Sequence, residues 1–80
     1  SLQPRIKLVR VGVGRLAGEN PVAEKIRERT GCTVVAVERD GQVGMDFPAS
    51  FRLSSDDALY LCGTTDAVAR YHAEFPTSRL

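Results

Sequence analysis

The chain has 80 residues, 42% of them hydrophobic and 26% charged, which is the composition of one small globular domain. This length excludes a complete dinucleotide-binding fold with two βαβαβ halves, and no apolar run approaches the roughly 20 residues that a transmembrane helix needs. The formal net charge of +1 gives no overall attraction to nucleic acid or to an anionic membrane.

The first predicted strand covers residues 6–13, where apolar side chains occur on both faces. A glycine-containing loop over residues 14–19 follows. Asn20 is a good N-cap for a helix, and Pro21 suits the first helical position because no N–H is needed there. The sequence therefore predicts a helix that begins at residue 20 or 21 and ends at Gly31, with its charged side chains on a solvated face.

The stretch before this helix also matches a nucleotide-binding pattern. Gly12, Gly14 and Ala17 fit G-x-G-x-x-[GA], and Glu38 lies about 20 residues further on, where an acidic residue would bind a ribose. In such folds the helix begins inside the glycine pattern, so Pro21 would fall within its first turns and cost about 3 kcal/mol. The next strand also leads into a hairpin rather than a second crossover helix. We interpret the match as coincidental.

The second half of the chain alternates short strands with turns before a final helix. Residues 32–39 have the strongest strand pattern, and Val35 at the centre is expected to be buried. Asp40-Gly41 then predicts a tight hairpin turn. The remaining predicted elements are a return strand over 42–47, a short edge strand or loop over 50–53, a strand over 58–62, and a helix that Thr64 or Thr65 caps and Pro76 ends.

This order of elements indicates an α+β fold. We expect a small, mainly antiparallel sheet packed against two helices, in the order strand-helix-strand-strand-strand-strand-helix.

Residue types that perform catalysis or bind metals are sparse. Cys32 and Cys62 share no metal-ligand spacing with each other or with His72, and both are expected to be reduced core residues, as in the cytoplasm. Asp56 and Asp57 are adjacent in a turn, so their carboxylates point apart, and no nucleophile accompanies them. The sequence therefore predicts neither an enzyme nor a metal site of three or more ligands.

Several segments resemble the C-terminal regulatory domain of RCK (TrkA-C) proteins. They are a helix ending in RTG, the strand TVVAVERDG and the closing segment DDALYLCGT. The resemblance as a whole covers residues 6–75. The resemblance implies a domain over residues 3–76, with a tail or cut linker over 77–80. Because the chain starts with Ser1 rather than methionine, we expect a piece of a longer protein.

The resemblance also implies a function. Such domains usually follow a Rossmann-like domain in subunits that control potassium channels and transporters, and they pair as dimers. The implied role is a cytoplasmic, homodimeric, ligand-sensing domain of a potassium or other ion transport protein, at the inner face of the cell membrane. In some relatives the regulatory ligand is cyclic di-AMP or a metal ion, so a cyclic dinucleotide or a divalent cation is the ligand to test. An assembly domain that binds no small ligand is the alternative, and no nucleic-acid partner is expected.

A small anionic ligand is expected at the start of the first helix, where unpaired N–H groups carry a partial positive charge. The expected ligand-binding residues are Arg15, Gly18, Glu19, Asn20 and Arg39. Arg15 can make a bidentate contact to a phosphate, and Gly18 lets the backbone approach closely. The open alternatives are that Asn20 satisfies the N–H groups while Arg15 is solvated, and that Glu19 repels an anion unless it points away or binds a cation.

Overall fold

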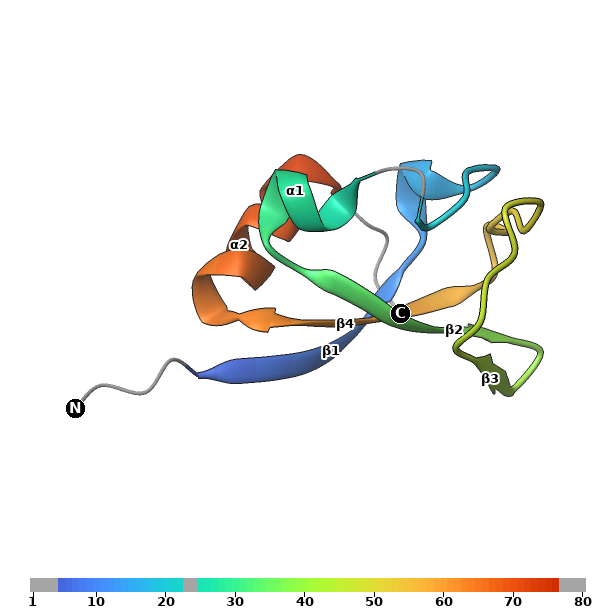
Figure 1. Ribbon diagram of the computed structural model, residues 1–80, viewed down its shortest axis with the longest axis horizontal. Coiled ribbons are helices and arrows are strands. Elements are labelled where there is room, and N and C mark those ends of the chain that lie inside the picture. Colours follow the sequence, from blue (N-terminus) through green and yellow to red (C-terminus); the bar gives the residue numbers. More distant parts are fainter. Residues whose placement is uncertain (1–4, 23–24, 77–80) are drawn as a thin grey trace.

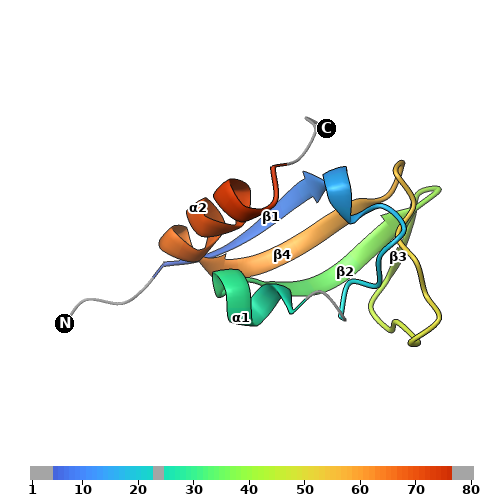
Figure 2. The ribbon, with the colours of Figure 1, turned by 90° about the horizontal axis from the view of Figure 1, so that it is seen from above.

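The computed structural model describes residues 5–22 and 25–76, and it confirms the α+β class. Within these residues one sheet has four strands in the order β1-β4-β2-β3, with every neighbouring pair antiparallel. Figures 1 and 2 show both helices on the same face of this sheet. The elements in chain order are β1 (Ile6–Gly12), the 3-10 turn η1 (Gly14–Leu16), α1 (Ile26–Thr30), β2 (Thr33–Arg39), β3 (Gln42–Gly44), β4 (Ala58–Thr64) and α2 (Thr65–Glu74).

The strand β4 lies at the centre of the fold because it pairs with both β1 and β2. Its side chains alternate between the two faces of the sheet, and Leu59 and Leu61 are fully buried on the face that the helices cover. Opposed residues of antiparallel strands share a face, so Val11 and Val37 flank Leu59. The apolar layer that results is the surface on which both helices pack.

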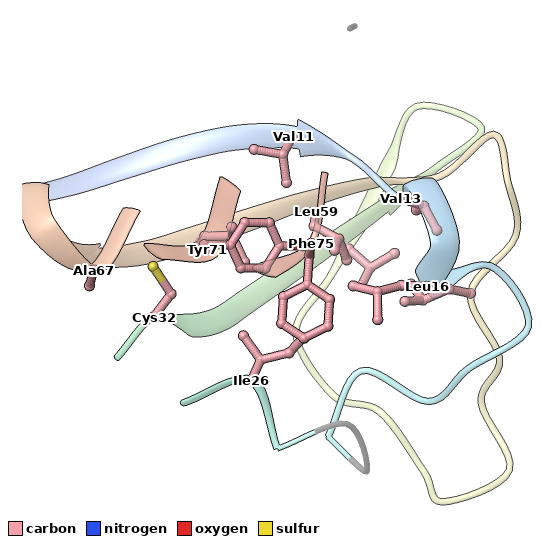
Figure 3. Packing of buried hydrophobic residues seen from close by; sticks show 12 residues of the cluster. Val11, Val13, Leu16, Ile26, Cys32, Leu59, Ala67, Tyr71 and Phe75 are labelled. Carbon is pink, nitrogen blue, oxygen red and sulfur yellow. The ribbon is translucent and has the colours of Figure 1, made fainter. Parts of the chain in front are cut away.

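The core fills the space between this layer and the helices (Figure 3). The rings of Tyr71 and Phe75 stack with centroids 5.2 Å apart, and neither side chain is exposed to solvent by more than 1%. Ile26 of α1 and Leu16 of η1 belong to the same buried cluster. The short first helix and the η1 turn are therefore held against the sheet mainly by apolar contacts.

The predicted start of the first helix, at residue 20 or 21, is wrong. The helix α1 begins at Ile26 and has five residues, and its predicted end at Gly31, with φ of 88°, is confirmed. Asn20 Oδ1 accepts a hydrogen bond from the Val22 N–H at 2.9 Å, which forms a local turn instead of a helix cap. Residues 23–24, which the prediction placed in the helix, lie outside the described residues.

Three strand predictions also differ from the structure. Residues 50–53 form no strand, because the backbone of Leu53 hydrogen-bonds to Gly18 and Glu19 instead of to the sheet. The return strand β3 ends at residue 44 rather than 47, because the chain turns inward there to pack a phenylalanine against the core. A register shift interrupts the pairing of β2, so Val35 is half-buried rather than buried. The tail over 77–80 lies outside the described residues.

The face of the sheet opposite the helices carries no covering element among the described residues (Figure 1). Ile6 and Leu8 of β1 are 62% and 66% exposed there. Near the middle of this face, Glu38 Oε1 accepts hydrogen bonds from the Tyr60 hydroxyl at 2.7 Å and from Arg10 Nε at 3.3 Å. Both hydrogen bonds lower the pKa of the Glu38 carboxyl, and the one from Tyr60 has the larger effect.

Candidate functional site

The five residues predicted to bind a ligand do not all lie together, and Arg15 is the one set apart. Its guanidinium donates a hydrogen bond to the backbone oxygen of Glu74 and lies 5.3 Å from the centroid of the Phe75 ring. Arg15 therefore contacts the end of α2 and not the start of α1.

Gly18 and Glu19 contact an irregular segment, residues 48–57, which we call the 48–57 loop. The Gly18 N–H donates to the Leu53 oxygen at 2.7 Å, and the Leu53 N–H donates to the Glu19 oxygen at 2.9 Å. This pair of backbone hydrogen bonds joins the two segments like a short ladder. Gly18 has φ of +86°, which few residues other than glycine adopt without strain.

Asn20 ties the same two segments together through its side chain. It is only 7% exposed, and its Nδ2 donates to the oxygens of Pro48 at 3.1 Å and Phe51 at 2.9 Å. A third backbone oxygen, that of Ala49, lies 3.4 Å away. Asparagine suits this position because one amide group supplies both the acceptor for the local turn and the donors for the loop.

Arg39 at the end of β2 fastens the other end of the 48–57 loop. Its guanidinium donates to both carboxylate oxygens of Asp57, at 2.8 and 2.6 Å, and to the Arg52 oxygen at 2.8 Å. It also lies over the Phe51 ring, 4.8 Å from the centroid. The Asp57 side chain is 2% exposed, so Arg39 forms its ion pair with a buried carboxylate, which balances its charge. Of the predicted ligand-binding residues, four contact the 48–57 loop, and their contact with a ligand stays a prediction.

A hollow of about 190 Å³ lies between the start of α1 and the start of β2. Its lining combines apolar side chains, among them Val22 and Ile26, with the two cations Lys25 and Arg27 and one carboxylate, that of Glu28. Neither cationic side chain has an ion pair or hydrogen bond with another described residue. Such a hollow can bind a phosphate at the cations and a flat apolar group against the aliphatic wall.

Sequence analysis missed these two cations because it assigned them to the solvated face of a long helix. The signal that could have found them is the basic pair Lys25 and Arg27 on either side of the apolar Ile26. With α1 beginning at Ile26, this pair stands at the start of the helix, beside the hollow.

A family model for the TrkA-C domain matches residues 8–75. The chain belongs to the TrkA-C domain family. No curated protein sequence matches it. Among the described residues of this TrkA-C domain, no helix is long and apolar enough to cross a membrane.

Solved structures of RCK C domains share the fold of this TrkA-C domain. The RCK C domain of the potassium transport protein KtrA, in complex with cyclic diadenosine monophosphate, has a TM-score of 0.77 and 18% identity over 89% of this chain and 85% of that chain. The RCK_C domain dimer of S. agalactiae BusR, in complex with c-di-AMP, has a TM-score of 0.69 and 20% identity over 85% of this chain and 88% of that chain. The GsuK RCK domain has a TM-score of 0.71 and 24% identity over 85% of this chain. The match covers only 16% of that chain.

Two of the similar structures contain DNA. S. agalactiae BusR in complex with its busAB-promotor DNA has a TM-score of 0.70 and 21% identity over 91% of this TrkA-C domain and 37% of that chain. The expectation that nucleic acid is not a partner is therefore not confirmed, and it stays a prediction.

Groups that could bind a metal ion or react are few in the part of the chain that the structure describes. No cluster of three or more His, Cys, Asp or Glu side chains there could hold a metal ion. Cys32 is buried and Cys62 half-buried, and both are free thiols. Burial raises the pKa of the Cys32 thiol, which keeps it protonated at neutral pH. A divalent cation as regulatory ligand stays a prediction.

Proposed function

We propose that this TrkA-C domain is a cytoplasmic regulatory domain of a potassium or other ion transport protein, and that it acts as a homodimer that senses a cyclic dinucleotide. Its family supports the regulatory role, and two RCK C domains with the same fold were solved with c-di-AMP, one of them as a dimer. The observation that carries the proposal is the hollow beside α1, where Lys25 and Arg27 stand unpaired among the described residues next to an apolar wall.

The chemistry of a cyclic dinucleotide fits this hollow. Its phosphodiester groups are anionic, so Arg27 can bind one of them with two parallel hydrogen bonds, while Lys25 adds a second positive charge. A hollow of about 190 Å³ has room for only part of the ligand, and the flat face of one base can lie against the exposed Val22. Because Val22 also turns back onto Asn20, a ligand held there stabilises the attachment of the 48–57 loop.

The site predicted from sequence remains a second placement for the same ligand. It uses Arg15, Gly18, Glu19, Asn20 and Arg39, of which Arg15 has the exposed guanidinium that a phosphate needs. The two placements differ in which arginine they require, so substitutions separate them.

Calorimetric titration of the chain with cyclic di-AMP tests the proposal. Arg27→Ala is expected to weaken binding at least about tenfold, or about 1.4 kcal/mol, because a phosphate loses its bidentate partner. Lys7→Ala removes the same charge from exposed β1 and serves as the matched control, with affinity expected to stay within about twofold. If Arg15→Ala weakens binding and Arg27→Ala does not, the ligand lies at Arg15 and the end of α2 instead of in the hollow beside α1.

The alternative function is assembly without a small ligand. A chain that dimerises but shows no saturable heat with cyclic di-AMP or any other phosphate ligand would establish this alternative and overturn the sensing role. Anisotropy of a labelled DNA duplex tests the nucleic-acid partner separately, and no binding is expected from a domain whose net charge is +1.

A further inference from the structure

We propose that a second hollow, between the β2–β3 hairpin and the 48–57 loop, binds a small organic ammonium ion. This hairpin hollow has a volume of about 350 Å³, within the size range of small-molecule sites. It is distinct from the hollow beside α1, and the proposal does not depend on dinucleotide binding. Its lining residues are Val37, Arg39, Asp40, Gln42, Val43, Gly44, Asp46, Phe47 and Phe51.

Two aromatic rings form part of the wall. Phe47 and Phe51 lie with centroids 5.5 Å apart and planes inclined at 44°, and both side chains are only half-buried. The faces of aromatic rings carry negative potential and attract cations within about 6 Å. The Arg39 guanidinium lies over one face of Phe51, 4.8 Å from its centroid, so the ring available to a ligand cation is chiefly that of the half-buried Phe47.

The charge around the hairpin hollow is negative. Asp40 and Asp46 belong to its lining, and neither forms an ion pair with another described residue. The one cation in the lining, Arg39, is neutralised by the carboxylate of Asp57. A phosphate or carboxylate ligand would therefore be repelled by Asp46, whereas a cation gains from Asp46 and, less strongly, from Asp40, whose charge also acts on Arg39.

Competing ligands satisfy only part of this lining. A divalent metal ion would find two carboxylates, and no cluster of three or more metal-binding side chains exists in residues 5–22 and 25–76. A neutral apolar molecule would use Val37, Phe47 and Phe51 but leave both carboxylates without a partner. An alkylated ammonium ion can contact the aromatic rings, the aliphatic side chains of Val37 and Val43, and the carboxylates at the same time.

Chemical-shift titration of the ¹⁵N-labelled chain tests the proposal, with choline as the probe. The comparison ligands are its neutral isostere 3,3-dimethyl-1-butanol and potassium chloride at equal ionic strength. Choline is expected to give saturable shifts at amides of residues 37–47 with a Kd on the order of millimolar, and the isostere to bind about fivefold more weakly. Asp46→Asn should weaken choline binding about fivefold, whereas Glu28→Gln, which removes the same charge from exposed α1, should leave it unchanged.

Phe47→Leu separates ring from charge, because it keeps an apolar side chain and removes the aromatic face. It should weaken choline binding about threefold and bring the affinities of choline and its neutral isostere closer together. Equal affinity for the two ligands in the parent chain, shifts that map away from the hairpin hollow, or no effect of Asp46→Asn would each overturn the proposal. If Phe47→Leu does not fold, Asp46→Asn decides alone, since Asp46 is exposed.

Discussion

Asp57 shows how one buried charge can organise a loop. Both of its oxygens accept hydrogen bonds from Arg39, and Oδ2 also accepts one from the Ser54 N–H at 2.8 Å. The hydrogen bonds from Arg39 have the largest effect on the pKa of the Asp57 carboxyl. Together with the hydrogen bond from Ser54 they outweigh the effect of desolvation, so the pKa is lowered. A carboxyl with a lowered pKa in the folded state stabilises the fold above its unfolded pKa, and this contribution disappears as the pH falls through the folded pKa.

Asp57→Asn should lower the free energy of unfolding by about 2 to 3 kcal/mol at pH 7, because Arg39 loses its partner and an amide group faces its donors. The difference from the parent chain should begin to shrink below about pH 4, where the carboxyl of the unfolded chain takes up protons, and should vanish only below the lowered pKa of the folded carboxyl. Urea unfolding at pH 7 and pH 3 measures both effects. Asp56→Asn, at the exposed neighbouring position, is the control and should change stability by less than about 0.5 kcal/mol. A penalty for Asp57→Asn that is the same at both pH values would contradict the argument.

At the scale of elements, residues 17–22 and the 48–57 loop act as one unit. Neither forms a regular helix or strand, yet Asn20, the backbone of Gly18 and Arg39 join them to each other and to the sheet. Buried backbone oxygens need donors, and Asn20 donates to those of Pro48 and Phe51, the second of which also accepts from Arg52. Asn20 is therefore a structural residue of this unit whether or not a ligand also contacts the loop.

Asn20→Asp tests this role because it keeps the acceptor for the Val22 N–H and removes both amide donors. The oxygens of Pro48 and Phe51 would then face a carboxylate, so we expect a loss of about 2 to 3 kcal/mol in the free energy of unfolding. Amides of residues 50–53 should exchange faster with solvent, which hydrogen-exchange NMR detects. Gln42→Glu adds the same charge at an exposed position and should change neither quantity. Unaltered exchange in Asn20→Asp would show that the loop is held by other contacts.

The same unit marks the limit of what the sequence could predict. The strands follow from apolar alternation and the Asp40-Gly41 turn, and α2 begins at its predicted cap, where Thr64 Oγ1 accepts a hydrogen bond from the Ala67 N–H at 3.1 Å. Asn20 gave an equally good local cap signal, but its amide bonds to oxygens 28 and 31 residues away. Contacts at that separation leave no local pattern. For the same reason the sequence grouped Arg15 with Gly18, although the fold turns it toward α2.

At the scale of the whole molecule, the two faces of the sheet differ. The helices cover one face (Figure 2), whereas the register of the strands places the exposed Ile6, Leu8 and Val43 on the other face. An 80-residue domain buries a modest core, and association adds apolar burial that the single chain lacks.

We therefore expect a homodimer in solution. Light scattering should give about twice the mass of the 8.7 kDa chain across a dilution series. The apparent melting temperature should rise with protein concentration, because association stabilises the folded state by mass action. A monomeric mass at hundreds of micromolar would rule the dimer out.

The position of β4 in the sheet also governs when the chain folds during synthesis. β1 pairs with residues 58–64, so this strand cannot enter the sheet until β4 has been made. Until then only the hairpin of residues 37–39 with 42–44 can form, and an isolated two-stranded hairpin is marginal in water. The nascent chain therefore stays open, with its valine-rich second strand exposed to chaperones, and closes in one late step. A fragment that ends before Ala58 therefore lacks the strand that joins β1 to β2.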